Sequence, residues 1–144
     1  MKNNIRNYIW NEFDEDVENI AKEVDLNQFQ TIVGISKGGL VLAIKLSNWA
    51  ELPLQIVTAC SYKNKKKKEL CVEYPNIISI KNPILLIDDI ADSGVTLNTI
   101  KNHLEVWGKT VKTLTLFYKN KSIIKPDYWV HKVMDKIWVQ FPWE

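Results

Sequence analysis

The sequence lacks the features of secreted proteins, of membrane-spanning proteins and of proteins that bind a metal through a Cys/His cluster. Only two of its 144 residues are cysteine and two are histidine, so it has no disulfide framework and no Cys/His cluster for a metal. No apolar run approaches the roughly 20 residues of a membrane-spanning helix, and residues 1–10 carry no apolar signal segment. We therefore expect no membrane span and a location in the reducing cytoplasm.

Two nucleotide-binding motifs and a strong net charge are also missing. The sequence contains neither the Gly-x-x-x-x-Gly-Lys of a Walker loop nor the Gly-x-Gly-x-x-Gly of a dinucleotide-binding fold. A formal net charge of +2 is too small to indicate a nucleic-acid partner. The composition, with 46% hydrophobic and 25% charged residues, is that of a globular protein, and the length predicts one domain over residues 1–144.

Helix and strand patterns alternate along the chain. Helices are predicted over residues 11–24, with Asn11 as the N-cap, 40–49 and 97–104. Strands are predicted over residues 29–35, 53–59, 70–74, 77–80, 84–87 and 109–118. This alternation indicates an α/β fold with a mainly parallel sheet, in which ligands bind at the carboxyl ends of the strands.

The stretch from residue 83 to residue 97 is the most informative part of the chain. Ile84–Ile87 is a short apolar run, typical of a strand buried on both faces, and Asp88 and Asp89 end it. Residues 92–96 then supply two hydroxyls, a glycine and successive backbone N–H groups before a helix begins. Unpaired N–H groups and the helix dipole together make an anion site. We expect the turn to hold a phosphate and the carboxylates to face hydroxyls or a metal ion.

This stretch closely resembles the phosphoribosyl pyrophosphate (PRPP) signature of type I phosphoribosyltransferases. The shared features are an apolar strand, two acidic residues and a turn that ends Thr/Ser-Gly-x-Thr. The resemblance implies that fold, with a flexible lid loop at about residues 60–75 and a small C-terminal hood at about residues 119–144. It places Mg²⁺ and the ribose hydroxyls at Asp88 and Asp89. It places the 5′-phosphate on the turn formed by Asp92, Ser93, Gly94, Val95 and Thr96.

A second strand, turn and helix precede this stretch. The turn is Ser36-Lys37-Gly38-Gly39, whose glycines let the backbone approach a ligand and whose lysine adds a cation. A second anion site is what a pyrophosphate leaving group needs. Family members carry a short Ser-Arg/Lys-Gly-Gly loop here that contacts pyrophosphate, so the resemblance assigns that role to all four residues.

Residues 60–70 break from any core pattern with a run of lysines. Such a run alone is typical of a solvated hairpin or loop. The alternative is a mobile lid that closes over a polyanionic substrate. Purine members of the family carry a flexible loop with a Ser-Tyr pair here, so we favour the lid and assign Ser61 and Tyr62 to it. Cys60 and Cys71 bracket this segment, and we interpret them as incidental thiols rather than a regulatory disulfide.

Three features point within the family to a 6-oxopurine substrate. Asp92 would accept the proton that N7 loses as N9 attacks C1′ of the sugar. Lys119, just past a predicted strand, would hydrogen-bond the 6-oxo group. The closing Trp-x-x-Phe-Pro-Trp-Glu looks like that of xanthine–guanine phosphoribosyltransferases, in which Trp138 would stack on the base and the backbone of Val139 would meet its 2-substituent.

Each of these features also has a purely structural reading. Asp92 could serve only as an acidic residue at a helix N-terminus, and Lys119 could be a solvated strand end. The tryptophans could pack in the core, where we place Trp10, Trp49 and Trp107.

The resemblance therefore predicts a purine-salvage pentosyltransferase. It would transfer the 5-phosphoribosyl group of PRPP to N9 of guanine, xanthine or hypoxanthine, with Mg²⁺ as cofactor, and would release pyrophosphate. Family members are generally dimers or tetramers, so we expect a homo-oligomer. Two alternatives stay open: a PRPP- or nucleotide-sensing regulator of the same fold, and a phosphoribosyltransferase for another base. We expect no nucleic-acid partner, because 144 residues leave no room for an added DNA-binding domain.

Overall fold

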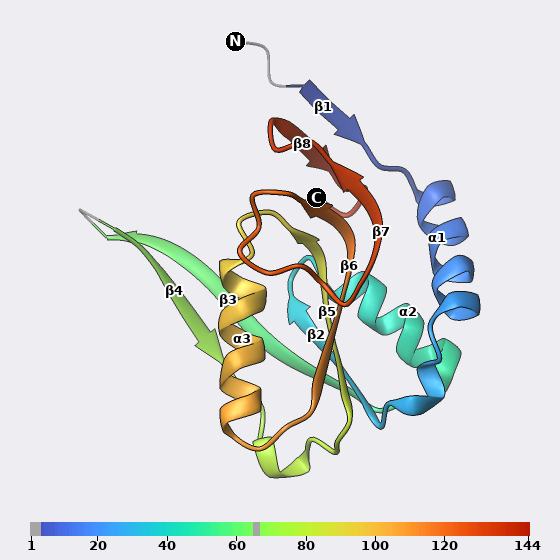
Figure 1. The fold of residues 1–144 in the computed structure, drawn as a ribbon, viewed down its shortest axis with the longest axis vertical. Helices are drawn as coiled ribbons and strands as arrows, with labels where there is room; N and C mark the ends of the chain where they lie inside the picture. The colour runs from blue at the N-terminus through green and yellow to red at the C-terminus, as the bar shows by residue number, and fades with distance from the viewer. Residues whose placement is uncertain (1–3, 65–66) are drawn as a thin grey trace.

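A six-stranded sheet forms the centre of the molecule (Figure 1). The computed structural model describes residues 4–64 and 67–144, and the side chains of all of these except residues 62–64, 67 and 68. In spatial order the strands are β4 (Lys67–Glu73), β3 (Leu54–Asn64), β2 (Thr31–Ser36), β5 (Ile84–Ala91), β6 (Val111–Lys119) and β7 (Tyr128–Val133). Every neighbouring pair is parallel except β3 and β4. The predicted α/β fold with a mainly parallel sheet is therefore confirmed.

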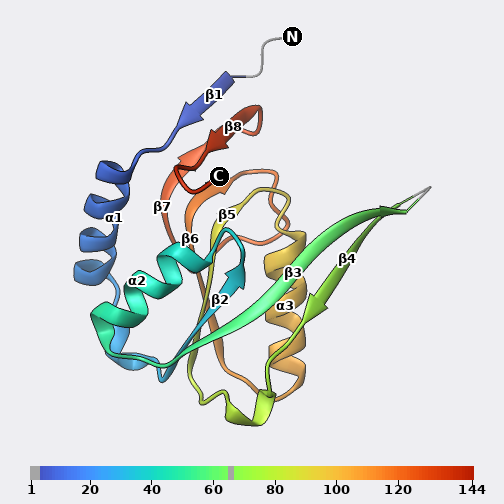
Figure 2. The same ribbon diagram turned by 180° about the vertical axis from the view of Figure 1, so that it is seen from behind.

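Helices cover both faces of this sheet (Figures 1 and 2). They are α1 (Trp10–Glu23), α2 (Leu40–Ala50) and α3 (Val95–Val106), with 3₁₀ turns at Leu26–Gln28 and Ile77–Ser79. Successive residues of β5 point to opposite faces, as in any strand. Leu85 and Ile87 pack in the cluster that contains α1 and α2, whereas Ile84 and Leu86 pack in the cluster that contains α3. All four side chains are fully buried, so the strand is buried on both faces as predicted.

A second, two-stranded sheet lies beyond the carboxyl ends of the central strands (Figure 1). Here β1 (Asn4–Asn7) pairs in parallel with β8 (Ile137–Gln140), so both ends of the described chain build it. We use the name hood below for this two-stranded sheet alone, which includes β1 and so differs from the hood of about residues 119–144 that the resemblance implied. Tyr8 anchors it, because its buried hydroxyl donates to Asp16 Oδ2 at 2.5 Å and its ring packs edge-on against Phe117 and Phe141. The sequence pattern did not predict β1.

The predicted loop at residues 60–75 is an antiparallel hairpin instead. β3 continues past Ala59, and Cys60, Ser61 and Tyr62 pair with residues 71, 70 and 69 of β4. Hydrogen bonds between β3 and β4 satisfy the backbone N–H and C=O groups of this polar segment. The two strands therefore pair without packing a side-chain face against the core. The hairpin projects from the sheet as an arm (Figure 2). Lys65 and Lys66 lie outside the described residues.

Three smaller predictions were wrong for local reasons. Asn11 is not the N-cap of α1: the helix begins at Trp10, and the Ile9 N–H donates to the Glu12 carboxylate at 3.1 Å. Residues 77–80 form a 3₁₀ turn rather than a strand, because Asn76 Oδ1 accepts from the Ile78 N–H at 3.1 Å.

The third wrong prediction placed three tryptophans in the core. Trp10, Trp49 and Trp107 are instead 49%, 57% and 45% exposed. By contrast, Trp143 is half-buried and stacks on Phe141 with ring centroids 4.9 Å apart. No helix in the described part of the chain is long and apolar enough to cross a membrane.

Candidate functional site

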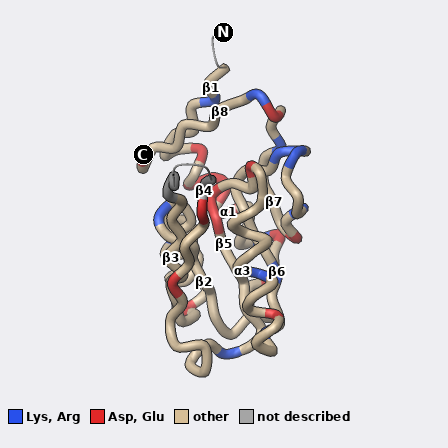
Figure 3. The backbone as a smooth tube through the Cα atoms, turned by 90° about the vertical axis from the view of Figure 1, so that its left-hand side faces the viewer, with Lys and Arg blue, Asp and Glu red and all other residues tan. Residues whose placement is uncertain are grey.

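The acidic segment of β5 lies at the end of the sheet that faces the hood (Figure 3). The sequence predicted that this strand ends before Asp88 and Asp89. β5 instead continues to Ala91, so both residues lie within the strand. The ladder with β6 supports this extension, pairing Asp88 with Thr115 and Ala91 with Tyr118. On the other side, pairing with β2 ends at Gly34 and Ile87. The acidic segment is therefore open toward the turn that follows β2.

That turn, residues 36–39, packs directly against the acidic segment. A side chain at Gly38 would overlap the Asp89 carboxylate, and a Cβ at Gly39 would lie 2.5 Å from the Ile87 carbonyl oxygen. The Gly39 N–H donates to the Ile35 carbonyl at 2.9 Å, and Lys37 is exposed. The two glycines thus bring the predicted pyrophosphate loop into contact with the predicted metal-binding carboxylates.

The two carboxylates hold their protons more tightly than ordinary aspartates. Burial and the neighbouring charge of Asp89 raise the pKa of Asp88, whose Oδ1 accepts from the Asp89 N–H at 2.9 Å. Burial likewise raises the pKa of Asp89. Within the described residues no three His, Cys, Asp or Glu side chains are grouped as a metal site. A cation here would therefore take two carboxylates plus oxygens of a bound ligand, a donor set that suits Mg²⁺.

The turn before α3 has the form of a phosphate cradle. Gly94 adopts a left-handed φ of 79°, and α3 begins at the next residue. The loop after β6 supports the turn from behind: the Ile123 N–H donates to the Ser93 carbonyl at 2.9 Å, and a side chain at Gly94 would overlap Ser122. Ser93 and Val95 are exposed. The Val95 N–H makes a long hydrogen bond of 3.4 Å to Ser93 Oγ, and the next N–H groups of α3 and the positive end of its dipole face the turn, where an anion can bind.

Asp92 is held by two lysines from the end of β6 and the loop beyond it. Lys119, 3% exposed, places Nζ 3.2 Å from Asp92 Oδ2, and Lys121 places Nζ 2.9 Å from Oδ1. Burial raises the pKa of Asp92, but the hydrogen bonds and charges of Lys121 and Lys119 outweigh it and leave the pKa below its usual value. Sequence reasoning identified Lys119 and missed Lys121, which a turn directly after β6, closed by the Ser122 N–H donating to the Lys119 carbonyl at 3.1 Å, brings to the same carboxylate.

Asp92 also lines a pocket under the hood together with Trp138 and Val139. Pairing of β8 with β1 positions both residues, leaving Val139 buried and Trp138 54% exposed. The structure therefore brings the four predicted purine-site residues to one place, because Lys119 reaches the same carboxylate. Asp89, predicted to bind Mg²⁺, also lines this pocket, together with three residues that sequence reasoning missed: Ile90, Phe141 and Glu144.

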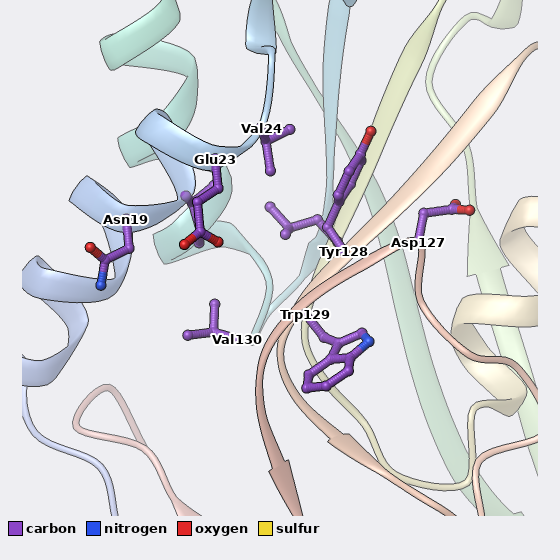
Figure 4. Close-up of a pocket in the computed structure, with 9 residues that line it drawn as sticks. Asn19, Glu23, Val24, Asp127, Tyr128, Trp129 and Val130 are labelled. Atoms are coloured by element: carbon purple, nitrogen blue, oxygen red, sulfur yellow. The ribbon is translucent and has the colours of Figure 1, made fainter.

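Two regions lie apart from this constellation. Ser61 and Tyr62 belong to the arm, which projects away from the central strands (Figure 2). A larger pocket of mixed polarity lies between α1 and edge strand β7 and contains none of the predicted site residues (Figure 4). Its labelled lining residues are Asn19, Glu23, Val24, Asp127, Tyr128, Trp129 and Val130.

Curated relatives of this chain include several xanthine-guanine phosphoribosyltransferases. The xanthine-guanine phosphoribosyltransferase of Chromohalobacter salexigens is 28% identical over 138 residues, which cover 94% of this chain and 81% of the relative. The enzyme of the same name from Desulfotalea psychrophila is also 28% identical over 138 residues, covering 94% of this chain and 83% of the relative.

Solved structures agree in fold. A xanthine-guanine-hypoxanthine phosphoribosyltransferase from Helicobacter pylori superposes with a TM-score of 0.81 at 25% identity, over 99% of this chain and 93% of that one. A purine phosphoribosyltransferase from Pyrococcus horikoshii gives a TM-score of 0.83 at 24% identity, over 97% and 94%. The family model of the phosphoribosyl transferase domain matches residues 7–144. The chain therefore belongs to the phosphoribosyl transferase domain family and has the type I phosphoribosyltransferase fold.

Proposed function

We propose that this protein transfers the 5-phosphoribosyl group of PRPP to N9 of a 6-oxopurine: guanine, xanthine or hypoxanthine. The products are a nucleoside 5′-monophosphate and pyrophosphate. One observation carries the proposal. Three parts lie together at one end of the sheet: the open acidic segment of β5, the phosphate cradle of α3 and the pocket lined by Asp92. Lys119 forms an ion pair with Asp92 there.

The sugar and phosphates of PRPP fit the part of the site built by β2, β5 and α3. Backbone N–H groups and hydroxyls of residues 93–96 would bind the 5′-phosphate. The pyrophosphate would meet Lys37 and the backbone of Gly38. Asp88 and Asp89 would bind the ribose hydroxyls and Mg²⁺, which when bound supplies positive charge to the pyrophosphate oxygens. A cation there would also offset the burial and mutual repulsion that raise the pKa of Asp88.

The purine fits the part of the site under the hood. Lys119 has three N–H donors and shares one with Asp92, so another is free for the 6-oxo group. Asp92 would accept the proton from N7, Trp138 would stack on the ring, and the backbone of Val139 would meet the 2-substituent.

In the transfer, one bond to C1′ breaks, another forms and one proton is removed from the base. The C1′–O bond to pyrophosphate breaks with its electron pair, C1′ gains oxocarbenium character, and N9 forms the new bond to C1′. N7 loses its proton to Asp92, which its low pKa keeps ionised beforehand. We propose that the arm closes over the site as the predicted lid and uses Ser61 and Tyr62 to exclude water.

We also propose a homo-oligomer in the cytoplasm. Exposed apolar side chains such as Trp49 and Trp129 support contact between copies. The free thiols of Cys60 and Cys71 support a reducing compartment.

The decisive experiment measures nucleotide formation by mass spectrometry. The protein is incubated with PRPP and Mg²⁺ and, separately, with guanine, xanthine, hypoxanthine, adenine and uracil. We expect product with at least one 6-oxopurine, and a loss of about 10²- to 10⁴-fold in kcat/KM for Asp92→Asn. Asp14→Asn, an exposed position on α1, is the matched control and should keep full activity. PRPP binding without product from any base would instead indicate a sensor.

A further inference from the structure

A lysine lies beside each oxygen of the Asp92 carboxylate. Lys119 Nζ lies 3.2 Å from Oδ2, and Lys121 Nζ lies 2.9 Å from Oδ1. The proposed function requires one of these oxygens to accept the N7 proton of the purine. Oδ1 is shielded from solvent and has no well-aligned hydrogen-bond partner among the described residues, so the N7–H can reach it once Lys121, 2.9 Å away, moves aside.

The two lysines differ in how easily they can do so. The side chain of Lys119 is 4% exposed, so leaving Asp92 would strand a buried charge, which is strongly unfavourable. The side chain of Lys121 is 47% exposed, and water can take over its hydrogen bonds. Ion pairs of such exposed groups contribute little to stability. Lys121 is the partner that can be displaced.

The backbone of Lys121 is fixed even though its side chain can move. Its N–H donates to Asp135 Oδ1 at 3.1 Å, in the turn between β7 and β8. Two residues on, the Ile123 N–H donates to the Ser93 carbonyl at 2.9 Å, in the phosphate cradle. The loop that carries Lys121 thus connects the turn between β7 and β8 to the cradle and keeps the lysine within reach of Asp92.

We propose that Lys121 is a positioning residue of the transfer reaction, holding Asp92 Oδ1 until the incoming purine displaces it. This proposal rests on the proposed function. Lys119 stays on Oδ2 throughout and keeps the carboxylate oriented. The N7–H of the base then takes the place of Lys121 and gives its proton to Oδ1 as the N9–C1′ bond forms and pyrophosphate leaves with the C1′–O electron pair.

The charges around Asp92 give this role a measurable consequence. Lys119 and Lys121 face the carboxylate, and Asp89 and Glu144 line the same pocket. Without Lys121, one cation remains against burial and two further carboxylates. The pKa of Asp92 should then rise, because the Lys121 hydrogen bond is the largest of the effects that lower it.

The test compares Lys121→Met and Lys121→Arg with the wild type. Carboxyl ¹³C NMR of the free protein follows the titration of Asp92, and steady-state kinetics with PRPP, Mg²⁺ and the preferred base give kcat and KM across pH. For Lys121→Met we expect a higher Asp92 pKa and an acidic limb of kcat/KM displaced to higher pH by the same amount. At pH 8 the KM for the base should fall by up to about fivefold, the equivalent of one exposed ion pair, with less change in kcat.

The remaining variants separate this role from a general effect of charge or folding. Lys121→Arg should stay close to wild type in both measurements. Lys125→Met removes an exposed lysine of the same loop that forms no ion pair within the described residues, and it should change neither. If the wild type is active and the pH profile of Lys121→Met is unshifted, the role of Lys121 is overturned and the proposed function is not. A wild type that turns over no base overturns the proposed function, and this role with it.

Discussion

At the scale of single residues, Gly38 shows how close the predicted pyrophosphate loop lies to the acidic segment of β5. Any side chain at this position would overlap the carboxylate of Asp89. The glycine is needed for the space beside it, whereas Gly94 is needed for its left-handed backbone as well. Lack of space and a left-handed backbone can be tested separately as reasons for a glycine. Gly108 has a left-handed φ of 85°, but no atom lies within 4 Å of the place that a Cβ would occupy.

Gly38→Ala should therefore weaken PRPP binding, because the new methyl group pushes Asp89 out of place. Overpacking of this kind costs about 1–3 kcal/mol, so we expect roughly tenfold weaker binding by calorimetry. Gly108→Ala is the matched control: it should lower stability by about 1 kcal/mol through its backbone conformation and leave PRPP affinity unchanged. Equal PRPP affinity in both variants would contradict the contact between the loop and Asp89.

At the scale of elements, β5 combines a strand buried on both faces with two carboxylates. This combination opposes folding at neutral pH, since burial raises the pKa of Asp88 and Asp89. A group with a raised pKa contributes stability below its unfolded-state pKa, about 4, and that stability is lost as the pH rises through the folded-state pKa. The folded protein is thus less stable when Asp88 and Asp89 are ionised, which is the state that binds a cation.

Asp88→Asn should accordingly raise the melting temperature at pH 7.5 in the absence of Mg²⁺. We expect a gain of about 2–4 °C, the shift that roughly 1 kcal/mol produces in a chain of this size, and no gain at pH 3.5. The amide oxygen of asparagine can still accept from the Asp89 N–H. Differential scanning calorimetry at the two pH values measures the effect, with Asp14→Asn as an exposed control. A lower melting temperature at pH 7.5 would contradict the sign of the pKa shift.

The sequence predicted the parts of these elements that depend on nearby residues. Ile84–Ile87 is apolar enough to identify a buried strand, and its two carboxylates and the following turn identify an anion site. The continuation of β5 to Ala91 was missed, because it depends on pairing with β6, whose residues lie some 27 positions later. β1 was missed for the same reason: Asn4–Asn7 is polar and pairs with a strand at the other end of the chain. Lys121 became significant only when the fold brought it to Asp92.

At the scale of the whole molecule, a buried polar cluster joins the N-terminal segment to the edge of the central sheet. Tyr8 donates to Asp16 Oδ2 at 2.5 Å, and His131 Nε2 on β7 lies 2.7 Å from the same oxygen. Tyr8 directly follows β1, and its N–H donates to the Gln140 carbonyl at 2.9 Å. The position of the hood, and hence of Trp138, depends on this cluster.

Tyr8→Phe should lower the free energy of unfolding by about 1.5–3 kcal/mol, as expected for a hydrogen bond to a charged group. The KM for the base should rise, because the hood loses an anchor, while PRPP affinity stays the same. Denaturant unfolding and calorimetry with PRPP measure the two effects. Tyr128→Phe is the matched control, because its hydroxyl makes only an exposed contact of 3.5 Å with Gln28. An equal loss of stability in both variants would argue against a special role for Tyr8.

The order of the strands has one more consequence. From β2 the chain crosses through α2 to β3 on one side, and from β5 it crosses through α3 to β6 on the other. Two adjacent strands whose connections leave in opposite directions necessarily have a crevice between their carboxyl ends. Under the proposed function, the sugar and phosphates of PRPP would bind in that crevice. The pocket proposed for the base is lined instead by the end of β5, by β8 and by residues after β8. The two parts share β5 alone, so substitutions in β8 would alter the base pocket and leave the crevice between β2 and β5 unchanged.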